Sequence, residues 1–190
     1  PCLMEIPRAS RGSSSPSGPI AEAHRTLRTS FAHLAESAGV KTLSIVSAGP
    51  GEGSSPVAVG LACALAQAGE RILLVDGNLS SPTLAAMLGV EASTGLAEVL
   101  EGKVPATDIV VATSIEGLSL MAAGSPTAHP GDLLGSKKLP EALKGLAETH
   151  DRILVSTPDL LSSADAISLA AASDSAVWVV AAGEISEDAL

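Results

Sequence analysis

Apolar residues in this chain follow two spacings that alternate along the sequence. Short continuous apolar runs predict buried parallel strands, and apolar positions recurring every three or four residues predict amphipathic helices. The strand-like runs are 41–47, 71–76, 108–113, 118–124, 151–159 and 175–183. The helical segments are 19–36, 57–68, 81–89, 94–101, 137–150 and 163–172, with a further helix expected to begin at 186.

Glycines follow several of the predicted helices, as expected for the left-handed residue that ends a helix. They are Gly69, Gly89 and Gly102. Strands that alternate with helices predict an α/β fold, with a doubly wound and mostly parallel sheet. Ligands of such sheets bind at the carboxyl ends of the strands. Segments 47–56, 76–81 and 156–159 all lie at such ends.

The composition fits one globular α/β domain, because 190 residues with 46% hydrophobic side chains can bury a sizeable core. Aromatic residues make up only 1% and tyrosine is absent, so Ala, Leu, Val and Ile must fill that core. We expect Trp178 in the core. Cys63 lies in an apolar helical pattern far from Cys2, which predicts a buried thiol rather than a disulfide.

The net charge of −10 argues against a large nucleic-acid-binding surface. No apolar run reaches the roughly 18 residues that a membrane-spanning helix needs, and no signal peptide is visible. Residues 8–18 are polar and rich in Ser and Gly, which is typical of a linker.

Residues 43–60 have the plan of a phosphate-binding loop, in which a strand runs through a glycine-rich turn into a helix. Ala48 opens the pattern, and three glycines continue it: Gly49, Gly51 and Gly53. In this plan backbone N–H groups and a helix N-terminus surround phosphates. The glycines can be purely structural, or the N–H groups at 51–55 can still attract an anion.

Three residues after the glycines decide what chemistry the loop can support. Ser54 stands where the pattern has lysine, and Ser55 keeps the hydroxyl that ligates Mg²⁺. Pro56 has no N–H to give a phosphate. The frame is that of a nucleotide site, whereas the charge that acts on the phosphates is missing.

An ordered run of segments resembles the bacterial tyrosine kinases (BY-kinases), the cytoplasmic P-loop domains that regulate capsule and exopolysaccharide chain export. The matching segments are EAHRTLR, SAGPGEG, ILLVDGNLSSPTLAAMLG, GLAEVLEG, HPGDLLGSKKL and ILVSTPD. The resemblance implies ATP and Mg²⁺ as cofactors of the intact family. It also implies a location at the cytoplasmic face of the bacterial inner membrane. Residues 1–18 would be a linker after a membrane-anchored region, and 19–190 the domain without its last strand.

The chain departs from the family pattern at the positions that carry catalysis. The family has lysine and threonine at the positions of Ser54 and Pro56. Its D-x-D motif is here Asp76-Gly77-Asn78. Two arginines of the family are replaced by Ser80 and Ser81, and the strand-end aspartate is replaced by Ser156. Phosphoryl transfer depends on such charges, and Mg²⁺ prefers carboxylate oxygens.

Two sets of surviving residues each carry two interpretations. Asp76 is either a catalytic or Mg²⁺-linked group, or a strand-end residue that caps the next turn. Ser55 is the other candidate ligand of Mg²⁺. Glu22, Arg25 and Arg28 fit the family's ExxRxxR pattern and imply a subunit contact. The other interpretation is a solvated helix face with an intrahelical ion pair. We expect His24 at the surface and His129 in a loop.

Three functional hypotheses follow. The first is a catalytically degenerate BY-kinase-like domain that regulates or scaffolds polysaccharide polymerisation and export. Its partners would be a second copy, an active relative or the membrane-anchored co-polymerase region. The second is a weak ATP-dependent tyrosine autokinase of the same pathway. The third is a positioning ATPase of the MinD/ParA type, which the ExxRxxR run disfavours.

Overall fold

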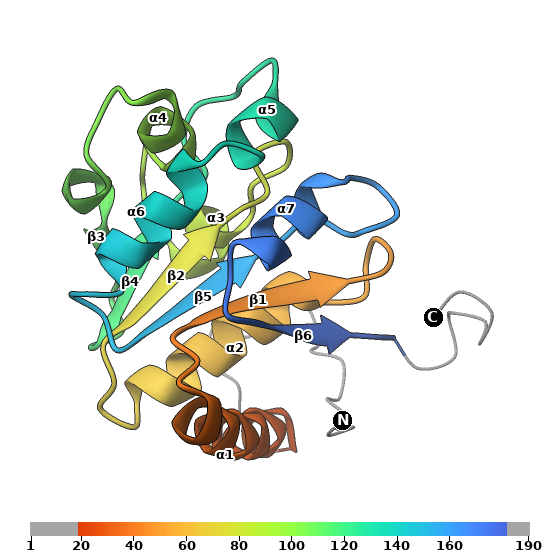
Figure 1. The fold of residues 1–190 in the computed structure, drawn as a ribbon. Helices are drawn as coiled ribbons and strands as arrows, with labels where there is room; N and C mark the ends of the chain where they lie inside the picture. Colours follow the sequence, from red (N-terminus) through yellow and green to blue (C-terminus); the bar gives the residue numbers. More distant parts are fainter. Residues whose placement is uncertain (1–18, 182–190) are drawn as a thin grey trace.

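The computed structural model describes residues 19–181 and contains one six-stranded sheet with helices on both faces (Figure 1). The strand order is β3-β4-β2-β5-β1-β6, and every pairing is parallel except the antiparallel pair β3 and β4. The strands are β1 (Thr42–Ser47), β2 (Ile72–Asp76), β3 (Val111–Ala112), β4 (Leu118–Met121), β5 (Arg152–Ser156) and β6 (Ser175–Val179). The predicted doubly wound, mostly parallel sheet is confirmed.

The predicted helices within the described residues are present, most of them shorter than expected. They are α1 (Pro19–Ala38), α2 (Ser54–Ala66), α3 (Leu84–Leu88), α4 (Leu96–Glu101), α6 (Lys138–Leu146) and α7 (Asp165–Ala171). The short helix α5 (Pro130–Leu134) was not predicted. The strand predicted at 108–113 begins later than predicted, and the predicted start is wrong. The 3-10 helix η1 (Ala106–Ile109) follows Pro105, and β3 begins only at Val111. The linker at 1–18 and the helix expected at 186 lie outside the described residues.

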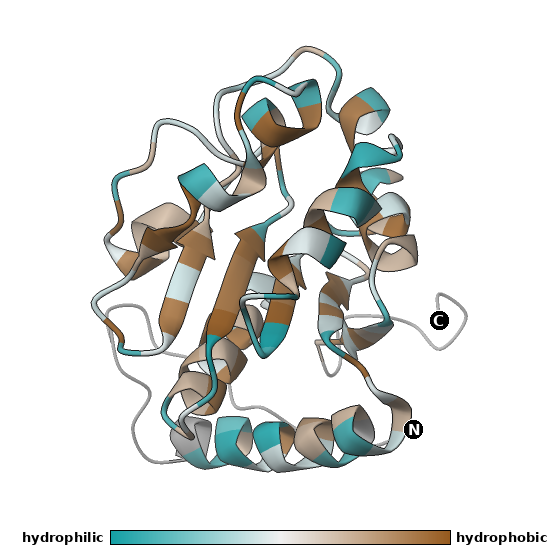
Figure 2. Ribbon diagram, turned by 60° about the vertical axis from the view of Figure 1, so that its left-hand side comes forward, coloured by the Kyte–Doolittle hydropathy of each residue, from teal (hydrophilic) through white to brown (hydrophobic). Residues whose placement is uncertain are grey.

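Two hydrophobic clusters lie on opposite faces of the sheet. One packs residues of α1 and α2 against the strands, and the other packs residues of α4, α5, α6 and α7 against the opposite face. Alternate residues of β2 serve the two clusters, with Leu74 on the α2 side and Leu73 on the other. The central strands are brown along most of their length in Figure 2, while α1 carries many teal residues.

The prediction that His24 lies at the surface is wrong, because its side chain is only 6% exposed. His24 packs where α1 crosses α2, against the backbone of Gly60. A Cβ atom at Gly60 would collide with the imidazole ring. The absence of a side chain at Gly60 therefore lets α1 approach α2 closely.

The prediction that Trp178 lies in the core is also wrong, because this residue is 52% exposed. β6 is the last strand of the sheet on the β1 side. Val177 and Val179 pack against the α1 and α2 cluster, so Trp178 points to the opposite face by the strand's alternation. α7 contacts β1 on that face. The buried thiol at Cys63 is confirmed, and its burial raises its pKa.

Among the helices within 19–181, none combines the length and the hydropathy needed to cross a lipid bilayer.

Candidate functional site

The glycine-rich loop joins the carboxyl end of β1 to the start of α2, as the sequence predicts. Gly51 and Gly53 have φ angles of 84° and 91°, a left-handed conformation that side chains disfavour. Gly49 has no such angle, and a Cβ atom there would meet nothing within 4 Å. The loop can therefore turn sharply just before α2, which begins with Ser54 and Ser55. The N–H groups in the first turn of a helix have no acceptor within that helix.

Glu52 folds its side chain back onto the start of this loop. Its Oε2 atom accepts hydrogen bonds from the N–H groups of Ala48 at 2.7 Å and Gly49 at 3.0 Å. Its other carboxylate oxygen is buried and has no hydrogen-bond partner within the described part of the chain. A carboxylate of the protein thus binds two N–H groups at the start of the loop, before the N–H groups at 51–55 that the loop plan offers to phosphate.

Hydroxyl groups gather where the predicted site residues meet. Ser47 Oγ donates to Ser54 Oγ at 3.2 Å. Ser55 Oγ lies 3.4 Å from Ser156 Oγ and accepts a hydrogen bond from Thr83 Oγ1 at 3.3 Å. The structure therefore brings Ser54, Ser55 and Ser156 to one edge of the sheet, as the sequence indicates. Pro56, in the first turn of α2, adds no N–H donor to this edge.

Asp76 ends β2 beside Ser156, its partner in the β2–β5 register, and is 1% exposed. Its Oδ2 accepts the N–H groups of Thr83 and Leu84, each at 3.0 Å. Its Oδ1 accepts the N–H of Asn78 at 3.2 Å. Burial raises the pKa of Asp76, and these three donors partly offset that effect. In this geometry Asp76 binds the turn that follows β2 and the start of α3.

Asn78 takes part in the same turn. Its side-chain Oδ1 accepts the N–H of Ser81 at 3.0 Å, so the oxygen that replaces a family carboxylate serves a local backbone contact. Thr157 follows β5 and donates to the carbonyl oxygen of Ile45 in the neighbouring strand β1 at 3.0 Å. These contacts hold the loops beside the site in shape.

Few charged side chains lie at the edge of the sheet where a P-loop binds Mg²⁺-ATP. Segments 47–56, 76–84 and 156–164, which carry these side chains, contain no Lys or Arg. Over residues 19–181 no group of three His, Cys, Asp or Glu side chains could hold a metal ion. Ser55 and Asp76, the predicted metal partners, both accept hydrogen bonds from Thr83.

Glu98 fixes a neighbouring loop and was not singled out from the sequence. It is 7% exposed and accepts the N–H groups of Gly95 at 2.7 Å and Ser125 at 3.0 Å. Burial alone would raise its pKa, but the hydrogen bonds from Ser125 and Gly95 outweigh burial and lower it. One sequence signal could have identified Glu98. It lies three residues after Gly95, the residue that precedes α4, and this is the capping-box spacing.

The predicted oligomerisation residues lie on α1, which packs on the same face of the sheet as α2 (Figure 1). Glu22 and Arg25 are both exposed and form an ion pair within the helix. Arg28, one turn further on, is partly exposed. The intrahelical pair is therefore present, and the exposure of both side chains leaves them accessible to a second protein.

The comparisons with known proteins first define the class. The structure is similar to that of the cell division ATPase MinD of Pyrococcus furiosus, with a TM-score of 0.66 and 31% identity over 73% of this chain and 58% of that one. The fold is thus that of the P-loop NTPases that include MinD. No protein-family model matches the chain.

Closer relatives define the family. The chain is 32% identical to tyrosine-protein kinase YwqD of Bacillus subtilis over 88% of its own length and 70% of YwqD. It is 33% identical to the putative tyrosine-protein kinase AmsA of Erwinia amylovora but spans only 20% of that protein. The chimerical protein CapA2B2 superposes with a TM-score of 0.84 and 29% identity over 92% of this chain and 76% of that one. The chain belongs to the bacterial tyrosine kinase family.

Proposed function

We propose that this chain is a catalytically degenerate BY-kinase domain that regulates or scaffolds polysaccharide polymerisation and export. The observation that carries the proposal is the absence of Lys and Arg from segments 47–56, 76–84 and 156–164. A kinase of this type stabilises the transferring phosphoryl group by charge and positioning. Ser54 offers one neutral hydroxyl in place of a lysine, and that hydroxyl already accepts a hydrogen bond from Ser47.

The residues that could bind Mg²⁺ support the same proposal. Mg²⁺ requires near-octahedral oxygen coordination and usually binds one or two carboxylates. Asn78 and Ser156 replace two of the family carboxylates. The remaining one, Asp76, directs both oxygens to backbone N–H groups. We therefore expect no tight binding of Mg²⁺-ATP.

The scaffolding half of the proposal rests on α1. Arg25 and Arg28 can bind carboxylates of a partner in bidentate geometry, and Glu22 can accept from a basic group. In a chain with a net charge of −10, two neighbouring arginines form a local positive site that favours an acidic partner. The partner would be a second copy, an active BY-kinase or the membrane-anchored co-polymerase region, reached through residues 1–18 at the cytoplasmic face of the inner membrane.

A weak tyrosine kinase of the same pathway is the second candidate, favoured by the names of relatives such as tyrosine-protein kinase YwqD. Within these 190 residues no tyrosine is available for autophosphorylation. A kinase function would therefore act on another protein or another part of a longer chain.

Two experiments test the proposal. Transfer of radiolabelled phosphate to a tyrosine-bearing relative should be undetectable. Transfer that Asp76→Ala abolishes would contradict the proposal that the domain is catalytically degenerate.

Sedimentation velocity should detect salt-dependent association that Arg25→Ala/Arg28→Ala weakens. The matched control is Lys137→Ala/Lys144→Ala, which removes two exposed lysines at α6. Equal association of both double variants would contradict the α1 contact.

A further inference from the structure

Arg152, the first residue of β5, contacts three segments that are far apart in the sequence. Its Nη1 atom donates to the carbonyl oxygen of Val40, which lies between α1 and β1, at 2.6 Å. Its Nε atom donates to the Oε2 atom of Glu70, which lies between α2 and β2, at 3.1 Å. Its guanidinium carbon lies 5.7 Å from the ring centroid of Phe31 on α1, which is within the range of a cation–π contact. One side chain of the sheet therefore links α1 to the turns that follow α1 and α2.

This link adds direction to the contacts that hold α1 on the molecule. α1 packs mainly on α2, through apolar side chains such as Leu27 and Phe31. Hydrophobic attraction is non-directional, whereas the planar guanidinium group donates along fixed directions. The Arg152 side chain is 18% exposed, and hydrogen bonds strengthen away from water. Arg152 therefore restricts the sliding and rotation of α1 on α2 more than apolar packing alone does.

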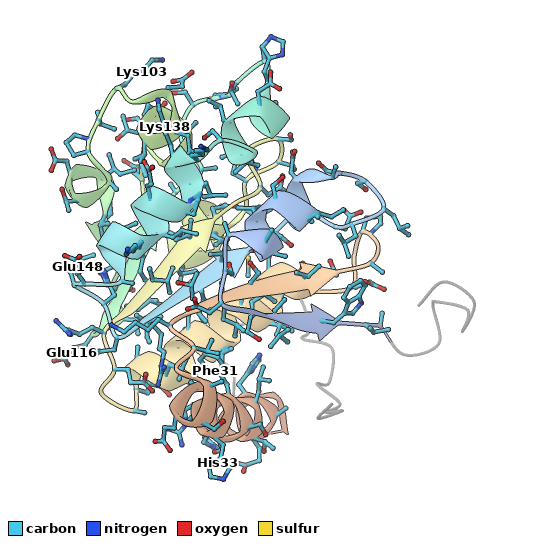
Figure 3. All side chains as sticks on the ribbon, in the orientation of Figure 1. Phe31, His33, Lys103, Glu116, Lys138 and Glu148 are labelled. Atoms are coloured by element: carbon cyan, nitrogen blue, oxygen red, sulfur yellow. The ribbon has the colours of Figure 1, made fainter. Side chains whose placement is uncertain are left out.

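The link lies close to the residues of the predicted subunit contact. Figure 3 shows Phe31 on the inner side of α1 and His33 on its outer side, and Phe31 is buried. Arg28 lies three residues before Phe31, so the two are neighbours on the helix. Hydrogen bonds from arginine to a carboxylate weaken steeply when their angles are poor. A rotation of α1 would therefore misalign both Arg25 and Arg28 towards a partner.

We propose that Arg152 is a positioning residue for the subunit contact, because it holds α1 in the orientation in which Arg25 and Arg28 bind the partner. Arg152 acts through α1 and does not itself touch the partner. This inference rests on the proposed function, since it requires association through α1. It assigns a role in association to a residue of the sheet that lies outside the ExxRxxR pattern.

The test measures self-association of the full chain by sedimentation velocity at several salt concentrations. Arg152→Ala removes all three contacts, and Arg152→Lys keeps the charge without the planar group. The control Arg71→Ala removes an exposed arginine at the same end of the sheet, where it binds Asp151. The control Glu98→Ala removes the buried acceptor of two N–H groups, so it destabilises the fold through α4 on the face opposite α1.

Arg152→Ala should weaken association about tenfold, or by about 1.4 kcal/mol, at a temperature at which circular dichroism shows every variant to be folded. Its salt dependence should equal that of wild type because Arg25 and Arg28 are still present, whereas Arg25→Ala/Arg28→Ala should lower the salt dependence. Arg152→Lys should recover part of the affinity, and both controls should match wild type.

Three results would overturn the proposal. The first is wild-type affinity in Arg152→Ala. The second is an equal loss of affinity in Glu98→Ala, because destabilisation would then be the cause. The third is a salt dependence of Arg152→Ala as low as that of Arg25→Ala/Arg28→Ala, because Arg152 would then contact the partner directly.

Amide hydrogen exchange in α1 separates this proposal from the proposed function, because it needs no association. The amides of α1 from Phe31 onward should exchange faster in Arg152→Ala than in wild type, and unchanged exchange would overturn the positioning role. If wild type associates and Arg152→Ala matches it, the role of Arg152 is overturned and the proposed function stands. If wild type associates neither with itself nor with an active relative, the scaffolding half of the proposed function fails. Exchange in α1 then still decides whether Arg152 holds the helix.

Discussion

The two ends of the sheet satisfy their carboxylates in different ways. At the amino ends of the strands, Asp151 pairs with Arg71 at 2.8 Å and Glu70 pairs with Arg152 at 3.1 Å. At the carboxyl ends, where nucleotides bind in this fold class, Asp76 accepts backbone N–H groups and no arginine or lysine. At the amino ends, Asp151 and Glu70 thus bind side-chain cations, although Asp151 and Asp174 there also accept backbone N–H groups. Asp76 at the carboxyl end accepts backbone N–H groups alone.

This difference bears on function because backbone N–H groups at the carboxyl ends are what a P-loop offers to phosphate. In this chain Glu52 accepts two N–H groups at the start of the P-loop, and Asp76 accepts three N–H groups of the segment between β2 and α3. Both carboxylates therefore bind the backbone of loops at the carboxyl ends. The predictions below test whether the two ends differ in energy as they do in geometry.

The largest effect is expected for Asp76→Ala, which leaves the N–H groups of Thr83, Leu84 and Asn78 without the acceptor that Asp76 supplies, the bond to Leu84 being buried. We expect the free energy of unfolding at pH 7 to fall by about 3 kcal/mol, measured by urea denaturation. The control Asp159→Ala removes a partly exposed carboxylate with one N–H partner, Ser162. Its loss should stay below about 1 kcal/mol. Equal losses would show that the three bonds contribute little.

At the amino end, Arg152→Ala should cost about 2 kcal/mol. The Arg152 side chain is 18% exposed, donates to the carbonyl oxygen of Val40 at 2.6 Å and lies 5.7 Å from the ring centroid of Phe31. The exposed Arg71 offers the comparison, since surface pairs contribute about 0–1 kcal/mol. Equal losses of stability for Arg71→Ala and Arg152→Ala in urea denaturation would show that burial does not determine how much these arginines stabilise the fold.

The smallest effect is a difference in pH dependence between the two ends. The pKa of Asp76 is raised by burial, so its contribution to stability falls as pH rises from about 3.8 through the raised value. Arg71 lowers the pKa of Asp151 to about 2. The contribution of Asp151 to stability is therefore present above about 3.8 and is lost as pH falls towards 2. Because Asp151 is 41% exposed, the contribution should stay within about 1 kcal/mol after solvent screening.

Urea denaturation at several acidic pH values, with Asp76→Asn and Asp151→Asn each compared with wild type, should therefore give slopes of opposite sign. Slopes of the same sign for the two variants would contradict the assignment of main-chain and side-chain partners to the two ends.

Local patterns were sufficient to predict the sheet, the loop and the meeting of Ser55 with Ser156, because strand runs and glycine positions are encoded over a few residues. They were not sufficient for His24, whose burial depends on Gly60 in another helix. The exposure of Trp178 depends on the order of strands in the sheet. The contact of Glu52 with Ala48 and Gly49 depends on a side-chain rotamer, which no spacing encodes.

The family motifs showed which residues were replaced but not what the remaining ones do. The sequence left Asp76 open between a catalytic group and a cap, and the difference lies in where its two oxygens point. That direction depends on the turn at 77–83, which the short helix α3 completes. Tertiary geometry therefore carries the information that composition and spacing lack.

Calorimetric titration of the wild-type chain with ATP, with and without Mg²⁺, decides whether this site binds nucleotide. We expect no binding in the low-micromolar range under either condition, because the loop lacks a cation and a free carboxylate pair. The combined variant Ser54→Lys/Pro56→Thr/Ser156→Asp should gain affinity if the frame is intact. Low-micromolar, Mg²⁺-dependent binding of ATP by the wild-type chain would show that the site is an intact nucleotide site.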